Sequence, residues 1–246
     1  MAASSGKETS EYENFSSYKF DPDDDSKYVS EIGERFASIS NIEPWWDGIN
    51  YNEYNALDSF TGSGYEEIND LQYNTAWEDM SSYDRDQIAT LHDALSKFEL
   101  NKGIEVNRAT SFLLFGAPDR YTKMSMSELR EYFAEHGTTV QNDGFMSFST
   151  RYDGIPLEGS GLVIHLRIPP SKGAGAYLGS NVGINRESEF LVNSNAVMKF
   201  DPSSMYSSNG QIHITADWLG QAKAQTISKT YTGALKVTAK SKKGKK

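Results

Sequence analysis

The chain has 246 residues, 37% of them hydrophobic and 12% aromatic, so it can bury the core of an ordinary domain. It contains no cysteine, which excludes disulfides and thiolate chemistry. The formal net charge of −10 disfavours general affinity for nucleic acid, and no stretch approaches the roughly 18 apolar residues that a membrane span requires.

Charge is concentrated at both ends of the chain. Residues 1–27 are rich in Ser, Glu and Asp, and we expect them to be disordered or loosely attached. The chain starts without the apolar segment of a secretory signal, so no signal peptide is expected. At the other end, residues 240–246 form a lysine-rich tail that is typical of solvated chain. Residues 28–239 are expected to form a single domain.

Residues 28–97 have the apolar spacing of helices. Ile32, Phe36 and Ile39 recur at i, i+4 and i+7, and a second apolar stripe runs from Ile88 to Phe98. After residue 103 the pattern changes to alternation, with a further helix predicted over 125–136. Its start is predicted at Ser127 and Arg130. Strands are predicted over 104–110, 144–150, 161–168, 187–192, 197–200, 211–216 and 234–239. Helices followed by short strands indicate an α+β fold.

Two of these strands carry polar side chains that require partners. Arg108 lies in a strand of otherwise mostly apolar and small residues, and its guanidinium stays charged. An internal salt bridge or a bound diphosphate would satisfy it. Ser147 and Ser149 share one face of a strand with Phe145, so that face meets either solvent or a polar ligand.

Glu187 and Glu189 project from the same face of the predicted strand over 187–192, because side chains two residues apart share a face. Paired carboxylates repel, and a cationic partner or a proton relieves the repulsion. A cationic sugar-like transition state or an arginine substrate would supply such a partner, so the pair favours an enzyme. The competing interpretation is an edge strand protected by charge.

Several stretches together resemble one family. The sequences over 59–69, 144–149, 166–170, 175–178 and 187–192 resemble, in order, those of the arginine-serine-glutamate clade of mono-ADP-ribosyltransferases. The enzymatic domain of iota-type binary toxins and the vegetative insecticidal protein are especially similar. The resemblance covers roughly 55–201 and implies an ADP-ribosyltransferase-like fold, in which N-terminal helices pack on a split antiparallel or mixed β-sheet.

The resemblance also implies roles for individual residues. The co-substrate would be NAD, and no metal would be required. Glu189 would stabilise positive charge on the ribose, oriented by Ser147, while Arg108 grips the diphosphate. Glu187 would accept hydrogen bonds from an incoming arginine of a target protein. Further NAD-binding candidates are Ser149, Ala109 and Arg151.

The sequence departs from this family pattern at two informative positions. Asn107 stands where an aromatic residue usually precedes the arginine, and Ile184 stands where the toxins often carry an aromatic residue that meets the protein target. The identity of the acceptor protein therefore stays open, with actin as one candidate. His165 is expected to be a packed or surface residue, since the four histidines lack metal-ligand spacing.

The expected function is that of a bacterial toxin or phage effector, secreted or delivered into another cell without a signal peptide, which acts in the cytosol of that cell. Two alternatives remain. One is an NAD glycohydrolase toxin on the same fold, whose acceptor is water. The other is a non-enzymatic member that binds a partner.

Overall fold

The computed structural model describes residues 11–21, 25–152, 160–179, 188–222 and 236–237. The chain forms helices first and mostly strands later, which confirms the α+β class. Its α-helices are α1 (Ser26–Ile39), α2 (Ile42–Gly48), α3 (Tyr51–Ser59), α4 (Tyr65–Asn74), α5 (Ser82–Ser96) and α6 (Met126–His136). Short helical turns are η1 (Phe15–Ser17), η2 (Phe60–Gly64), η3 (Trp77–Asp79) and η4 (Phe112–Phe115); η2 is a π-helix that joins α3 to α4.

Most strands belong to one mixed sheet. Along its main path the order is β12, β4, β10, β11, β6, β3, β5, β9 and β8, with β1 paired to β3. The β11–β6 and β1–β3 pairs are parallel and the others are antiparallel. The strands are β1 (Tyr12–Asn14), β3 (Gly103–Thr110), β4 (Thr139–Asn142), β5 (Met146–Ser149), β6 (Leu162–Ile168), β8 (Gly175–Tyr177), β9 (Glu189–Val192), β10 (Ala196–Ser208), β11 (Gln211–Gln221) and β12 (Lys236–Val237), with β2 (Glu99–Leu100) and β7 (Ser171–Lys172) paired separately.

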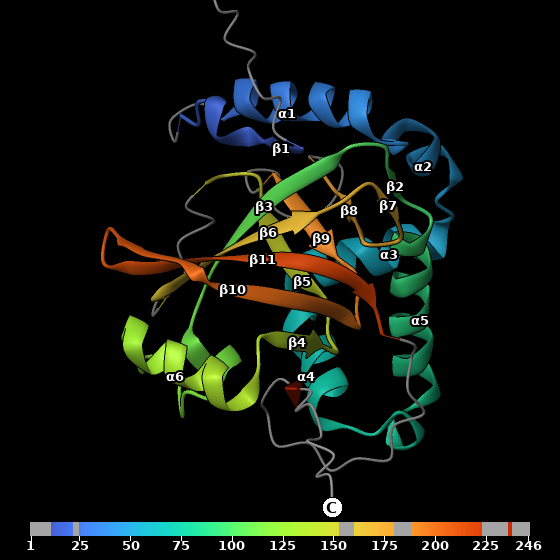
Figure 1. Ribbon diagram of the computed structural model, residues 1–246. Coiled ribbons are helices and arrows are strands. Elements are labelled where there is room, and N and C mark those ends of the chain that lie inside the picture. The colour runs from blue at the N-terminus through green and yellow to red at the C-terminus, as the bar shows by residue number, and fades with distance from the viewer. Residues whose placement is uncertain (1–10, 22–24, 153–159, 180–187, 223–235, 238–246) are drawn as a thin grey trace, which may run out of the picture.

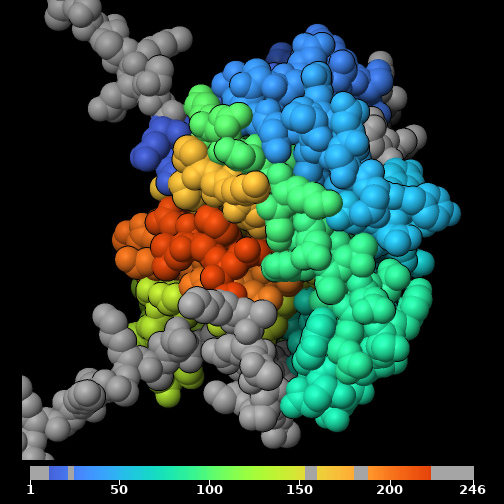
Figure 2. Space-filling model, turned by 90° about the vertical axis from the view of Figure 1, so that its right-hand side faces the viewer, coloured from blue at the N-terminus to red at the C-terminus, as the bar shows by residue number. Residues whose placement is uncertain are grey.

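Helices surround this sheet on several sides. Figure 1 shows α1 across one end, α5 along one side and α6 beside β10. Figure 2 shows the N-terminal helical part, in blue to teal, next to the C-terminal strands, in orange and red, on one face of the molecule. The strand order brings β3, β5 and β9, which are far apart in the sequence, into one continuous part of the sheet.

The predicted stripe on α1 is confirmed as its buried face. Ile32, Phe36 and Ile39 are buried, together with Tyr28 one turn earlier. The ring of Phe36 stacks on Tyr177 with centroids 4.1 Å apart. Because an aromatic side chain of this size removes 150–250 Å² from water, burial of this stripe fixes α1 against the strands β8 and β9.

Helix α5 supports the same core from another side. Ile88, Leu91, Ala94 and Leu95 are buried, as the predicted stripe requires. The indole nitrogen of Trp45 donates to the Ala94 carbonyl at 2.8 Å. This bond satisfies the polar atom of a buried tryptophan and ties α2 to α5.

Residues 11–21 differ from the expectation of a disordered N-terminal segment. Strand β1 pairs in parallel with β3, and Phe15 is buried against Phe36 at 5.3 Å between ring centroids. Glu13 forms ion pairs with Arg35 at 2.5 Å and Lys102 at 2.7 Å, and its bond to Arg35 is the main cause of a lowered Glu13 pKa. Acidic composition alone missed these contacts because they are made with residues distant in sequence.

The helix predicted over 125–136 is confirmed as α6, but its start is set by other residues than predicted. Its N-cap is Ser125, whose side chain accepts from the Glu128 backbone N–H while the Glu128 carboxylate accepts from the Ser125 backbone. This capping box satisfies donors that the first turn leaves without helical partners, so Ser125 and Glu128 define the start rather than Ser127 and Arg130.

Candidate active site

One cavity of about 230 Å³ lies where β3, β5 and β9 meet the helices. Pockets that enclose drug-sized ligands have roughly 300–1,000 Å³, so this cavity suits one end of a dinucleotide rather than the whole. The residues that line it are Phe60, Thr61, Gly62, Tyr65, Asn69, Asn107, Arg108, Ala109, Phe145, Ser147, Phe148, Ser149 and Glu189.

The strand register brings the sequence-predicted residues together. Asn107 on β3 pairs with Ser149 on β5, and Ser149 pairs on its other side with Glu189 on β9. Ser147 pairs with Leu191, so it lies two residues from the direct partner of Glu189. Arg108, Ala109, Ser147, Ser149 and Glu189 therefore all line one cavity.

Arg108 contributes the cation of the cavity. Its Nη1 atom donates to the backbone carbonyl of Ser147 at 2.5 Å, which joins β3 to β5. Burial lowers the pKa of this guanidinium, and Tyr73, Glu189 and Tyr65 act in the opposite direction. A guanidinium has five N–H donors and stays charged in proteins, so Arg108 retains the capacity to bind an anion.

Glu189 is the first residue of β9 and is 9% exposed. Its backbone carbonyl accepts from Leu178 at 2.9 Å, which fixes the start of the strand. The preceding Ser188 has a φ of 44° in the left-handed region, and its carbonyl accepts from the Thr150 backbone at 3.3 Å. The extended strand predicted from residue 187 is therefore wrong at its start, and Glu187 lies outside the described residues.

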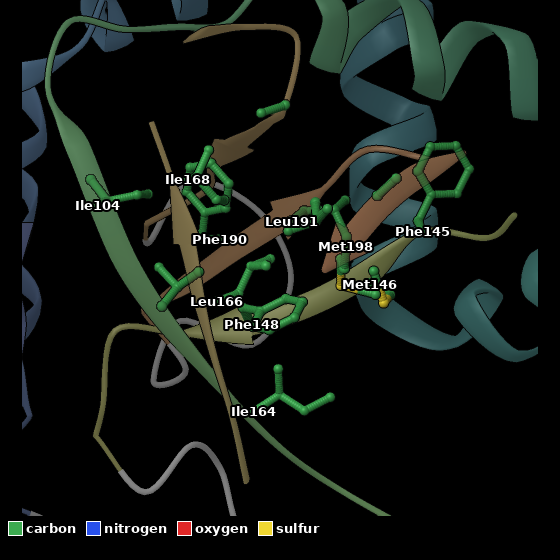
Figure 3. Packing of buried hydrophobic residues seen from close by; sticks show 14 of the residues in the cluster. Ile104, Phe145, Met146, Phe148, Ile164, Leu166, Ile168, Phe190, Leu191 and Met198 are labelled. Carbon is green, nitrogen blue, oxygen red and sulfur yellow. The ribbon is translucent and has the colours of Figure 1, made fainter. Parts of the chain in front are cut away.

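The two serines of β5 differ in exposure. Ser147 is half-buried and Ser149 is buried, and the Ser149 hydroxyl accepts from the Arg151 backbone at 3.1 Å. Phe148, between them, lines the cavity as well and belongs to the same hydrophobic core as Leu166 and Phe190 (Figure 3). The alternation along β5 thus separates the two hydroxyls from the apolar core.

Arg151 is placed apart from the other predicted residues. Its guanidinium lies over the ring of Phe20, 3.9 Å from the centroid, in a cation–π contact. The described lining of the cavity contains no atom of Arg151. This contact engages the Arg151 guanidinium with an N-terminal residue, a long-range interaction that the local sequence does not encode.

The helical wall of the cavity was missed as a source of site residues. Phe60, Thr61 and Gly62 of η2 line it, as do Tyr65 and Asn69 of α4. The signal in the sequence was the family-like stretch over 59–69, which contains all of them.

Asn69 ties this wall to the serine strand. Its Oδ1 atom accepts from the Phe145 backbone at 2.9 Å, and the ring of Phe60 packs edge-on against Phe145 at 5.4 Å. A Cβ atom at Gly144 would lie 2.7 Å from the same Asn69 oxygen and 2.6 Å from the Tyr73 hydroxyl. The chain entering β5 therefore passes α4 too closely for a side chain at residue 144.

The described residues also bear on metal sites and on membrane spans. No group of three or more His, Cys, Asp or Glu residues with the geometry of a metal site occurs among them. Within the same residues, no helix has the length and apolar character needed to cross a membrane.

Comparison with known proteins places this site in a family. The model of the ADP-ribosyltransferase exoenzyme family matches residues 34–221, which is most of the chain. The chain belongs to that family. The match includes all the residues that line the cavity.

A curated relative is NAD(+)–arginine ADP-ribosyltransferase EFV of Enterococcus faecalis, which is 26% identical over 155 residues. The alignment covers 62% of this chain but only 29% of that relative. The chain thus spans less than a third of the length of the curated protein it matches.

Solved structures show that family members share the fold. Plx2a, an ADP-ribosyltransferase toxin from Paenibacillus larvae, is 19% identical with a TM-score of 0.65, covering 79% of this chain and 96% of that one. BECa, from a binary enterotoxin of C. perfringens and solved with NADH, is 22% identical with a TM-score of 0.63, covering 82% of this chain and 50% of that one.

Proposed function

We propose that this protein is an NAD-dependent mono-ADP-ribosyltransferase that transfers ADP-ribose to an arginine of a target protein. The observation that carries the proposal is the convergence of Arg108, Ser147 and Glu189, from three strands, on one cavity. Family membership and the printed activity of the Enterococcus relative support the same reaction.

Charge development during the reaction explains the proposed roles. Cleavage of the nicotinamide–ribose bond builds positive charge on the ribose, as in glycoside hydrolysis. The carboxylate of Glu189, the first residue of strand β9, is largely buried and stabilises that charge more in the transition state than in the ground state. Ser147 and Ser149 flank the carboxylate and orient it and the ribose.

Arg108 is proposed to bind the diphosphate of NAD. A planar guanidinium binds phosphate oxygens with paired hydrogen bonds, and its bond to the Ser147 carbonyl orients the group. Ala109, next to it on the cavity wall, leaves room for the dinucleotide. Arg151, stacked on Phe20, is retained as an NAD-binding candidate only if binding moves it.

Glu187 is proposed to accept hydrogen bonds from the acceptor arginine and to help remove its proton. The acceptor is a protein with an accessible arginine, and actin is one candidate. A bacterial toxin or effector with this activity would be delivered into another cell and act in its cytosol.

The test is incubation of the protein with NAD labelled in the adenylate and with two acceptors, purified actin and the small guanidine agmatine. We expect labelled acceptor with the wild type, none with Glu189→Gln, and free ADP-ribose without labelled acceptor with Glu187→Gln. The matched control is Glu34→Gln, an exposed carboxylate on α1.

Each outcome of this test separates the candidate functions. Free ADP-ribose alone from the wild type, with no label on actin or agmatine, would favour an NAD glycohydrolase. Unchanged labelling by Glu189→Gln would reject the assignment of the catalytic carboxylate. Absence of NAD consumption would indicate a non-enzymatic member.

A further inference from the structure

A buried polar cluster borders the cavity at Asn107, the neighbour of Arg108 on β3, and the proposed reaction does not use it. Its members are Asn107 of β3, His165 of β6, His213 of β11, Tyr206 of β10 and Tyr152, which follows β5. Asn107 and both histidines are buried, whereas Tyr152 and Tyr206 reach the surface. We call these five residues the histidine cluster.

Hydrogen bonds determine which ring nitrogens carry protons. The Oδ1 atom of Asn107 lies 2.6 Å from Nδ1 of His165, and Nε2 of His165 lies 2.9 Å from Nδ1 of His213. An amide oxygen can only accept, so Nδ1 of His165 carries a hydrogen. The Nε2 atom of neutral His165 must then accept from Nδ1–H of His213. With both rings neutral, this row of bonds satisfies the Asn107 oxygen and both nitrogens of His165.

Tyr152 and Tyr206 cover the two histidines on the side that faces solvent. The ring of Tyr206 stacks on His213 at 4.7 Å between centroids, and Tyr152 packs on His165 at 4.9 Å. The two tyrosine hydroxyls are hydrogen-bonded to each other, and the Tyr206 hydroxyl also lies 3.4 Å from Nε2 of His165. The histidine pair is therefore enclosed by aromatic rings.

The histidine cluster is connected to two of the three strands that line the cavity, β3 and β5. Asn107 directly precedes Arg108 and pairs in register with His165 on one side and with Ser149 on the other. Tyr152 follows Ser149 by three residues. A buried amide that loses its hydrogen bond costs about 1–3 kcal/mol, so a change at His165 is transmitted to the point where the arginine and serine strands join.

We propose that His165 is a positioning residue: paired with His213, it holds Asn107, and through Asn107 the Arg108 and Ser149 strands, in the geometry that binds NAD while the imidazoles are neutral. This inference rests on the proposed function, since it deepens the account of the NAD site. It predicts weaker NAD binding in acid.

The groups around His165 give the direction of this response. Besides His213, Tyr152 and Tyr206, the charged group that acts on it is Arg167 of β6, which is paired with Glu105 at 3.1 Å. Burial, and then the positive charges of protonated His213 and of Arg167, lower the pKa of His165 to about 4. A proton on Nε2 would face the N–H of His213, so the bond between the two rings would persist only if His213 moved its own proton from Nδ1 to Nε2.

The first experiment needs no NAD. Long-range ¹H–¹⁵N correlation spectra of the histidine rings at pH 7.5 should show both His165 and His213 neutral with the proton on Nδ1. A protonated ring, or His165 with its proton on Nε2, would overturn the proposal whether or not any variant folds.

The second experiment measures the dissociation constant of NAD by calorimetry from pH 7.5 to 4. In the wild type the constant should rise about twofold by pH 4, because a group with a pKa of about 4 is then half protonated. His165→Gln, which cannot titrate, should weaken binding at pH 7.5 by about threefold or more and remove most of the acid dependence. His136→Gln on α6, a histidine remote from the cavity, should behave as wild type.

Failure of this inference and failure of the proposed function give different results. A wild type that binds no NAD at pH 7.5 rejects the NAD site itself. A wild type that binds NAD, with an acid dependence that His165→Gln leaves unchanged, overturns only the role of the histidine cluster.

Discussion

Arg108 and Asn107 are neighbours on one strand, yet their side chains meet different kinds of surroundings. Arg108 faces an open cavity with a carboxylate, two hydroxyls and a helical wall. Asn107 also lines this cavity, but its amide oxygen lies 2.6 Å from Nδ1 of the buried His165, whose ring stacks on that of His213. One residue step along β3 thus leads from a guanidinium near the Glu189 carboxylate to an amide that is bonded into a buried network. The comparison indicates that the cavity side supplies chemistry and the cluster side supplies position.

The largest expected effect is on the cavity side. Glu189→Gln should reduce NAD turnover by about 100- to 1,000-fold, as loss of one transition-state electrostatic contact does in other enzymes. Its stability to urea should change little, because the amide nearly matches the carboxylate in size. Turnover and urea melting are measured on the same preparation. A variant that loses stability in proportion to activity would make Glu189 a structural residue.

The next largest expected effect is that of the histidine cluster on the free energy of unfolding. The folded-state pKa of His165, about 4, lies below its ordinary value of 6.5, so the unfolded chain binds a proton first as the pH falls. The contribution of His165 to stability is therefore complete above pH 6.5. It should decrease by about 3 kcal/mol on lowering the pH to 4.

Urea melts of the wild type and His165→Gln across this pH range measure that loss. The wild type should lose more stability than the variant between pH 6.5 and 4, and the two curves should be parallel above pH 6.5. Identical pH dependence in both proteins would contradict the lowered pKa.

A smaller effect is expected for Arg108→Lys. Lysine keeps the charge but lacks the planar pair of donors, so the dissociation constant for NAD should rise about tenfold, or ~1.4 kcal/mol. Arg130→Lys, at an exposed position on α6, is the control. An unchanged dissociation constant in Arg108→Lys would show that the diphosphate is held elsewhere.

The smallest effect tests the backbone before Glu189. Ser188 is in the left-handed region, which costs residues with a Cβ about 1–2 kcal/mol. Ser188→Gly should therefore be more stable than Ser188→Ala by about 1 kcal/mol, offset in part by the greater freedom of glycine in the unfolded chain. Both variants lose the hydroxyl, so the comparison isolates the backbone. Equal urea midpoints would show that this conformation is unstrained.

Sequence reasoning succeeded where the pattern is local. The apolar spacing of Ile32, Phe36 and Ile39 predicted the buried face of α1, and alternation predicted the strand that carries Arg108. It failed at Ser188, because a single left-handed residue leaves no periodic signal. It also failed for residues 11–21, whose pairing with β3 depends on a distant partner.

The candidate site was predicted in part. Resemblance to a family selected Arg108, Ser147 and Glu189, which share a cavity. It selected Arg151 as well, whose guanidinium lies instead over Phe20. The family resemblance included residues 59–69 but did not assign them to the site, although Thr61, Tyr65 and Asn69 form one wall of the cavity.

By itself the sequence determined which segments are helices and strands and which side chains can carry charge, because periodicity and side-chain chemistry are properties of the chain. Only the tertiary structure decided that Asn107 joins Ser149 on one side and His165 on the other. Strand pairing brings together residues far apart in the chain, and its register is set by the packing of the whole core.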